Sequence, residues 1–192
     1  MRKLTTIFAL AILFSAVAAF GQERPFRIGL KFGYPQLAGL NLEYVTPALN
    51  ERLSADVDLS YFGLTSGDAS VSYTFLYFGA NYYFFNEGEG LYGGLGYGRQ
   101  AFGADVTITD NANSGLTAQG EASIGLNSLY LKIGGKHGGL FYFKWNVGYG
   151  IALTDGKLEA SATFNGVKQV EEVDLPISGG GPMVDLGFGF SF

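Results

Sequence analysis

The stretch VDLGFGFSF, residues 184–192, decides the fold. Phe188, Phe190 and Phe192 stand at every second position, and the last residue printed is one of the three. Alternate side chains of a β-strand point to opposite faces, so this spacing predicts a strand with one apolar face. Chain termini are usually polar and poorly ordered. An apolar stripe at the terminus therefore indicates a strand that neighbouring strands hold in place.

The same period of two recurs along the chain. In FRIGLKFGY, residues 26–34, apolar side chains alternate with Arg27, Gly29, Lys31 and Gly33. A half-buried strand has this pattern. The alternation predicts eight strands, at about residues 26–34, 38–45, 53–63, 72–84, 91–103, 121–134, 140–153 and 182–192.

Two segments need a separate interpretation. In the sixth strand, Ile124 and Leu126 have the opposite parity to Leu129, so we expect a bulge near Asn127 and Ser128 that resets the register. In the longest connection, near 154–181, an Asn-Gly pair at 165–166 lies between strand-like runs. Asn-Gly in this setting is a strong hairpin signal, and we expect a ribbon that projects beyond the main body.

The composition is unusual for a water-soluble protein. Aromatic residues make up 16% of the chain, glycine accounts for 30 residues, and only 15% of residues are charged. Soluble domains average about 25% charged residues. The chain has no cysteine, which excludes a disulfide, a thiol nucleophile, a cysteine metal site and a lipoprotein anchor.

The first residues have the layout of a secretory signal peptide. Arg2 and Lys3 precede an apolar run at 7–14, and the small residues SAVAAFG follow. We expect cleavage after Gly21, with Ala18 as the alternative. The competing interpretation, an uncleaved anchor, is less favoured because the run is shorter than the roughly 20 residues of a helical span. Cleavage after Gly21 gives a signal peptide, residues 1–21, and an outer-membrane β-barrel, residues 22–192.

The mature chain is acidic. Of the 12 basic and 17 acidic residues, two basic ones lie in the expected signal, so the remainder carries a formal charge of −7. No basic cluster occurs along the chain. Nucleic-acid binding is therefore not expected.

Two architectures use such strands. A soluble barrel of the lipocalin type points its apolar face inward, whereas a membrane barrel points it outward and lines the lumen with polar residues. The second is favoured because the polar faces are rich in glycine and carry charges of both signs. Aromatic residues also mark both ends of the apolar faces, as in interfacial girdles, at Phe26, Tyr34, Phe84, Phe141 and Tyr149.

The sequence thus predicts an all-β fold, a closed eight-stranded antiparallel transmembrane β-barrel. Open strand edges do not survive in lipid, so the sheet must close. An even number of strands puts both termini on one side, and the expected signal peptide makes that side periplasmic. The longer loops would then be extracellular.

From about Phe26 to Phe192, the chain resembles the outer-membrane β-barrel domain family, the OmpA/OmpX-like small barrels. The most specific match is the terminal alternation, at Leu186, Phe188, Phe190 and Phe192. The resemblance implies a Gram-negative type of outer membrane, with outer-membrane lipid around the barrel. It also implies biogenesis through periplasmic chaperones and the barrel-assembly machinery, which would read the terminal pattern as an insertion signal.

Charged residues are expected to line the lumen. An eight-stranded barrel has an interior that side chains fill, and charges there need partners. A plug of salt bridges is favoured over a gated proton or ion path. We predict that Arg27 pairs with Glu43, and that Lys31 meets Asp58 or Asp185. The expected set is Arg27, Lys31, Lys132 and Lys144 against Glu43, Asp56, Asp58 and Asp185.

Other candidate motifs are weak. His137, the only histidine, lies in the short turn GKHGG, away from the outer rim where a membrane-barrel hydrolase would need it. TDNANSG (109–115) lacks the spacing of a calcium loop, and GGLGYG (93–98) lacks the Lys-Ser/Thr ending of a phosphate loop. We expect no catalytic residue, no metal and no cofactor.

The function expected from these patterns is non-enzymatic, either structural or a surface interaction through the extracellular loops. A narrow, porin-like channel for small solutes is the alternative, and a lipid-modifying enzyme is the less favoured third class. The sequence does not indicate an extracellular ligand.

Overall fold

The structure is a computed structural model and describes residues 24–109, 117–164, 167–178 and 180–192. The expected signal peptide with both candidate cleavage sites, the Asn-Gly pair at 165–166 and most of TDNANSG (109–115) lie outside the described residues. Within these ranges the chain is all-β, and no helix is long and apolar enough to cross a membrane.

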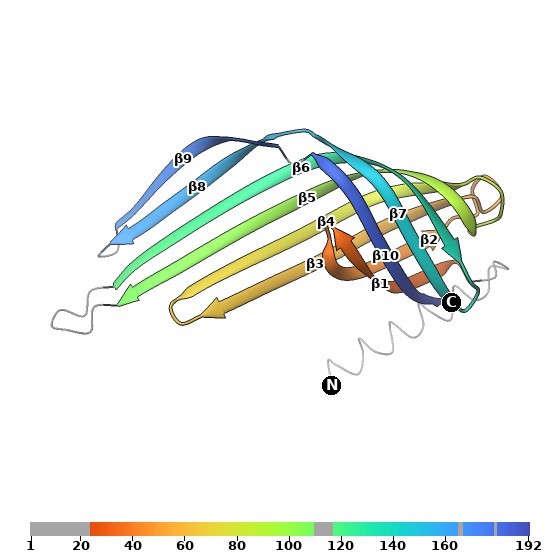
Figure 1. Cartoon of the computed structure of the whole chain (residues 1–192), viewed down its shortest axis with the longest axis horizontal. Coiled ribbons are helices and arrows are strands. Elements are labelled where there is room, and N and C mark those ends of the chain that lie inside the picture. Colours follow the sequence, from red (N-terminus) through yellow and green to blue (C-terminus); the bar gives the residue numbers. More distant parts are fainter. Residues whose placement is uncertain (1–23, 110–116, 165–166, 179) are drawn as a thin grey trace.

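One antiparallel sheet contains all the strands that the structure describes (Figure 1). The strands are β1 (Phe26–Tyr34), β2 (Leu37–Val45), β3 (Leu53–Ser66), β4 (Ala69–Tyr83), β5 (Gly90–Thr109), β6 (Thr117–His137), β7 (Phe141–Ala152), β8 (Asp155–Phe164), β9 (Val167–Ser178) and β10 (Gly181–Ser191).

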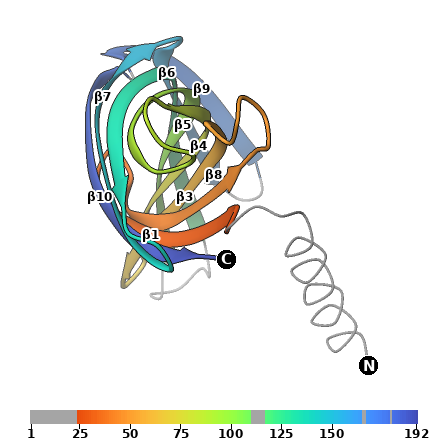
Figure 2. The same ribbon diagram turned by 90° about the vertical axis from the view of Figure 1, so that its right-hand side faces the viewer.

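Eight of these strands close into a barrel. The order is β5-β4-β3-β2-β1-β10-β7-β6-β8-β9, and a further pairing of β5 with β6 joins the ring. Strands β1 to β7 and β10 therefore form a closed eight-stranded antiparallel barrel, which confirms the predicted strand number and closure. Figure 2 shows the ring from its end.

The terminal strand completes the ring. Strand β10 pairs with β1 from Arg27 opposite Ser191 to Tyr34 opposite Val184. At the end of the ladder, the Phe192 amide donates to the Phe26 carbonyl over 2.7 Å. The apolar alternation at the terminus therefore belongs to a strand that closes the barrel, as the opening stretch predicts.

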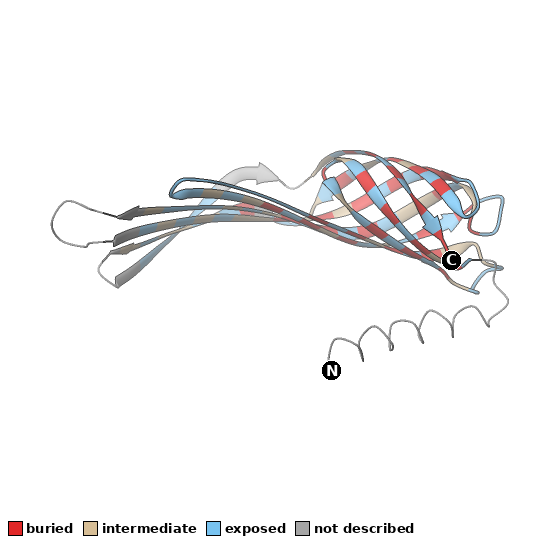
Figure 3. Ribbon diagram, turned by 90° about the horizontal axis from the view of Figure 1, so that it is seen from below, coloured by how far each residue is buried: buried red, intermediate tan, exposed pale blue. Residues whose placement is uncertain are grey.

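Burial alternates around the barrel wall. Along β10, Met183, Asp185 and Ser191 are buried, while Val184 and Leu186 between them are about half exposed. The other barrel strands repeat this alternation, and buried and exposed residues form a checkered pattern on the wall (Figure 3). Charged, polar and aromatic side chains thus fill the interior beside inward-facing glycines, and apolar side chains cover the outside.

Four barrel strands continue far beyond the ring. Strands β1 and β2 have 9 residues each, whereas β3, β4, β5 and β6 have 14, 15, 20 and 21. The hairpin β8–β9 pairs with the outer half of β6, from Ala118 to Gly125. We call this open extension the blade, and it comprises residues 61–66, 69–74, 101–109, 117–125, 155–164 and 167–178.

The blade confirms the expected projecting ribbon, but it is larger than the sequence predicts. The strands continue beyond the limits expected at 63, 72, 103 and 121. Near these residues the alternation of apolar and polar side chains changes phase, and serine, threonine and glycine become frequent, so the sequence no longer indicates a strand. The connection near 104–120, between the fifth and sixth expected strands, was expected to be a loop, whereas its described parts are strand.

The predicted bulge in the sixth strand is wrong. Strands β5 and β6 pair without a shift from Gly90 opposite Lys136 to Thr109 opposite Thr117. Leu126 faces inward, in phase with the buried Tyr130. Its apolar side chain fits there because the mouth of the lumen is itself apolar.

Candidate functional site: the barrel interior

The eight charged residues expected in the lumen all lie inside the barrel, and none is more than 6% exposed. Six strands bring them together in the lumen. They are Arg27 and Lys31 on β1, Glu43 on β2, Asp56 and Asp58 on β3, Lys132 on β6, Lys144 on β7 and Asp185 on β10.

Glu43 is the acceptor nearest the chain termini. Arg27 Nη1 lies 3.2 Å from Glu43 Oε2, in the pairing that the sequence predicts. The hydroxyl of Tyr83 donates to Glu43 Oε1 over 2.8 Å and accepts from Arg27 Nη1 over 2.9 Å. Ser54 donates to the same Oε1 over 2.5 Å. This carboxylate therefore has the ionic and neutral partners that a buried charge needs.

Asp56 occupies the centre of the network. Lys132 Nζ lies 2.5 Å from Asp56 Oδ2, and Lys144 Nζ lies 3.4 Å from Asp56 Oδ1. Lys144 also lies 3.1 Å from Glu43 Oε2, so it joins the two layers. Asn41 donates from Nδ2 to both Asp56 and Asp58, over 2.6 Å each.

Lys31 forms the layer nearest the blade. Its Nζ lies 2.6 Å from Asp58 Oδ2 and 3.4 Å from Asp185 Oδ1, so it meets both of the acceptors that the sequence offers as alternatives. Asn146 donates to Asp185 Oδ1 over 2.6 Å. The eight charges balance in sign. Ion pairs join them in two groups, and the Asn41 amide bridges the groups by donating to Asp56 and Asp58.

An aromatic cap closes the lumen on the blade side. It consists of Tyr73, Phe75, Tyr77, Tyr130 and Met183, which are all at most 7% exposed. The Phe75 and Tyr130 rings meet edge to face at 6.0 Å, and Lys132 lies 4.4 Å from the Tyr77 ring centroid. Sequence reasoning missed this cap, although aromatic residues at inward-facing positions of the fourth strand were a readable signal.

Two glycines make room for the cap. A Cβ on Gly98 would lie 2.6 Å from the Tyr130 ring, and a Cβ on Gly150 would lie 2.7 Å from the other edge of that ring. Real side chains do not approach so closely. The glycine-rich inward faces of β5 and β7 are thus shaped by the aromatic side chains that fill the lumen.

The opposite end of the lumen opens into a polar hollow of about 370 Å³. Arg27 and Ser191 line its floor, and Lys136 donates to the Gly138 carbonyl at its side. His137, at the end of β6, is exposed. In the part of the chain that the structure describes, no group of three histidine or acidic side chains could hold a metal ion.

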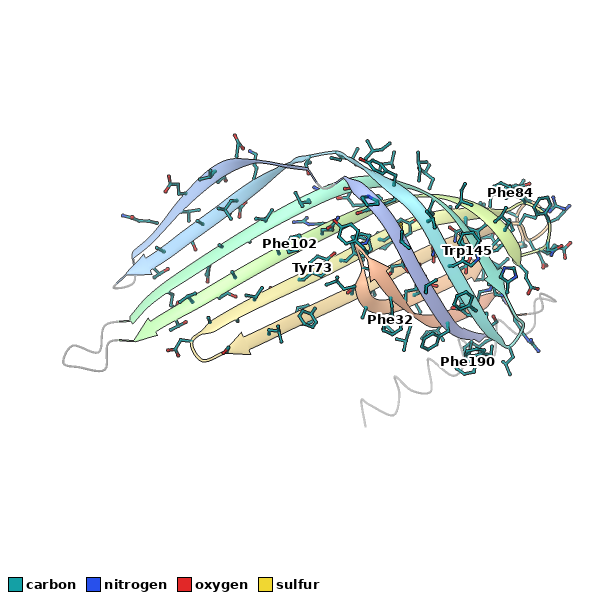
Figure 4. The ribbon with its side chains drawn as sticks, in the orientation of Figure 1. Phe32, Tyr73, Phe84, Phe102, Trp145 and Phe190 are labelled. Atoms are coloured by element: carbon teal, nitrogen blue, oxygen red, sulfur yellow. The ribbon has the colours of Figure 1, made fainter. Side chains whose placement is uncertain are left out.

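The outer surface is an apolar belt. Phe188 stacks on Phe32 with ring centroids 5.9 Å apart, and Phe190 meets Phe141 at 5.6 Å (Figure 4). The four residues expected to act as an insertion signal, Leu186, Phe188, Phe190 and Phe192, are between 43% and 53% exposed on this belt. Their role in insertion stays a prediction.

A scan against protein-family models finds no match for this chain, and a search of the curated proteins finds no matching relative. The resemblance to the OmpA/OmpX-like barrels therefore rests on the sequence pattern. The closed barrel is compatible with that resemblance but does not establish the family.

Proposed function

We propose that the protein is a non-enzymatic integral outer-membrane β-barrel that holds the blade at the cell surface for interaction with other molecules. The apolar belt around a polar, filled interior is the observation that carries this proposal. In water, such a surface would expose dozens of large apolar side chains, far more than a soluble protein tolerates.

The height of the belt supports membrane insertion. Outward-facing positions of β7 are apolar from Phe141 to Ile151. Ten residue steps cover about 34 Å along a strand, and a tilt of about 40° reduces the height to about 26 Å. The apolar band of known outer-membrane barrels is about 25 Å tall.

The chemistry of the interior favours a closed scaffold over a channel. Ion pairs link the buried charges, and Phe75, Tyr77 and Tyr130 lie across the lumen on the blade side. A permeating ion would need to break several buried pairs and displace the cap. The small-solute channel therefore remains the second candidate without a specific observation in its favour.

The expected export signal gives the proposed orientation. With both ends of the barrel chain in the periplasm, the blade would stand outside the cell, on the opposite side from Phe26 and Phe192. Surface loops and extensions on a rigid scaffold commonly carry specificity. An interaction through the blade is thus the role that this arrangement supports best.

The test combines membrane insertion with conductance. The mature chain is refolded into detergent and then into lipid vesicles, where a heat-modifiable gel band should report the closed barrel. The same preparation in a planar bilayer should give no steady conductance. A steady conductance would overturn the closed-scaffold proposal in favour of the channel, and a stable monomer in detergent-free buffer would overturn membrane insertion.

A further inference from the structure

The blade reverses the polarity of the barrel wall. In the barrel, inward positions are polar and outward positions are apolar, whereas in the blade the inward-facing positions are apolar. The residues directly opposite one another across the paired strands make this visible, because they lie on the same face of the sheet. Three such rows cross the blade from β3 to β9.

The row nearest the barrel consists of bulky apolar residues throughout: Phe62, Tyr73, Phe102, Ile124, Leu158 and Val173. The second row is Leu64, Val71, Ala104, Ala122, Ala160 and Glu171. The third is Ser66, Ala69, Val106, Gly120, Ala162 and Gln169. We call these three rows the inner face.

Most of the inner face is exposed or half-buried, and Tyr73 at its base is buried. Leu64 is 63% exposed, Val71 58% and Phe62 51%, and the Tyr73 and Phe102 rings meet at a tilt at its base with centroids 4.8 Å apart (Figure 4). Six strands about 4.8 Å apart make the face about 24 Å wide, and three rows cover about 20 Å along the strands. An apolar patch of roughly 480 Å² is within the size range of functional patches on proteins.

The charges of the blade favour a basic partner. Glu171 is the single charged residue among the eighteen positions of the inner face. The rows on the opposite face carry Asp105, Glu121, Glu159, Glu172 and Asp174 against Lys157 and Lys168. None of the eighteen positions is basic, so a second copy packed face to face would bring no cation to Glu171, and an uncharged small molecule would make no use of this carboxylate.

A hollow beside Glu171 could receive a basic side chain of such a partner. It has a volume of about 530 Å³ and is lined by Ala160, Ser161, Ala162, Gln169, Val170 and Glu171. Four of these residues belong to the inner face. The small alanine side chains leave room beside the one carboxylate, where a lysine or arginine side chain can lie with its stem on apolar surface and its charge near Glu171.

Resting on the proposed outer-membrane scaffold, we infer that the inner face of the blade is a docking surface for a cationic amphipathic helix. An α-helix is about 10–12 Å across and rises 1.5 Å per residue, so 16 residues measure about 24 Å. The three rows of the inner face cover about 20 Å along the strands, so such a helix spans them with less than one turn to spare. The apolar side of the helix covers the inner face, and its basic side chains meet the acidic edge along β9.

The probe is a labelled 16-residue peptide of leucine and lysine, with the leucines spaced along one helical face. Its binding to the mature protein in neutral-lipid nanodiscs and in neutral detergent is measured by fluorescence anisotropy, against empty nanodiscs and micelles. A peptide of the same composition in which the leucines are scattered around the helix serves as the peptide control. Only the amphipathic peptide should bind above the empty background, and added salt should weaken the binding.

Adjacent residues on opposite faces of β6 give a matched pair of variants. Ala122→Gln places a polar side chain in the centre of the inner face and should weaken binding roughly tenfold. Ser123→Gln makes the same side chain on the other face and should leave binding unchanged. Glu171→Gln should weaken binding about threefold at low salt and reduce the salt dependence. The heat-modifiable band checks that each variant keeps its barrel.

Several results would overturn the inference. Equal binding of both peptides would indicate strand addition at a blade edge, and equal loss in the two β6 variants would exclude the inner face. A dimer in sedimentation without peptide, lost in Ala122→Gln alone, would assign the face to a second copy. If the protein inserts into nanodiscs but does not bind the peptide, only this inference is refuted. If the protein does not enter nanodiscs, the proposed function is refuted, and the measurement in detergent still decides whether the peptide binds.

Discussion

Asp56 is the position where a single change should disturb the barrel interior most. Its carboxylate serves both Lys132, at 2.5 Å, and Lys144, at 3.4 Å. In Asp56→Asn the size is kept and the charge is lost. Lys144 keeps Glu43 at 3.1 Å, but Lys132 has no second carboxylate in ion-pair contact among the described residues.

The expected loss of unfolding free energy follows from this difference between the two lysines. A buried cation left without its partner costs about 3–5 kcal/mol, and we expect Asp56→Asn to lose this much free energy of unfolding. Lys132→Met should lose less, about 1–3 kcal/mol, because Asp56 keeps Lys144 and the Asn41 amide. The double variant removes both charges, so its loss should fall short of the sum by at least about 1.5 kcal/mol.

Urea unfolding of the refolded barrel in lipid vesicles measures these losses. Trp145, the only tryptophan, reports unfolding by fluorescence, and the heat-modifiable band reports barrel closure. Glu159→Gln, on the exposed face of β8, is the matched charge control and should stay within about 0.5 kcal/mol of the wild type. Additive losses, or a loss below about 1 kcal/mol for Asp56→Asn, would refute the view that Lys132 depends on this carboxylate.

Two further predictions concern the strand end and the glycines. Deletion of Phe192 should lower the amount of protein at the cell surface yet leave the stability of the refolded barrel nearly unchanged. Phe188→Ser should also destabilise the refolded barrel in vitro, by about 1–2 kcal/mol. If quantitative blotting shows equal surface amounts of the deletion variant and the wild type, Phe192 is an ordinary belt residue. Gly98→Ala should cost about 1–3 kcal/mol in urea unfolding because its Cβ would press on Tyr130, and Gly120→Ala, whose Cβ would meet nothing within 4 Å, should cost nothing.

The barrel wall was predictable from the sequence because each strand there separates two different environments. Alternation in stretches such as 26–34 and 184–192 assigns every residue to one face, and closure follows from the terminal strand. The lumen residues followed as the polar half of the same pattern. The pair of Arg27 and Glu43 needed only the assumption that the first two strands are adjacent.

The partners of Asp56 were not predictable in the same way. Lys132 and Lys144 come from strands on the far side of the ring, 76 and 88 residues away along the chain. Which side chains meet across a lumen depends on the tilt of the strands and on the space that glycines leave. The alternation of apolar and polar residues gives no information about either. The bulge predicted near Asn127 was wrong for a related reason. The inward position of Leu126 looked like a break in the alternation, whereas in the structure Leu126 lies beside the apolar cap.

The phase change at the mouth of the barrel is what the proposed membrane insertion would require at the boundary between lipid and water. Along β4, the outward residues are Leu76 and Phe78 in the wall but Ser72 and Thr74 one row higher, in the blade. Along β5, the outward Leu95 gives way to Asp105. A strand that stayed in one environment would keep one phase, so the proposed membrane insertion implies that the outer surface passes from lipid to water near the mouth of the barrel. If the belt lies in lipid, as we propose, the blade stands in water with its apolar side inward, and that side gains stability only from a partner that covers it.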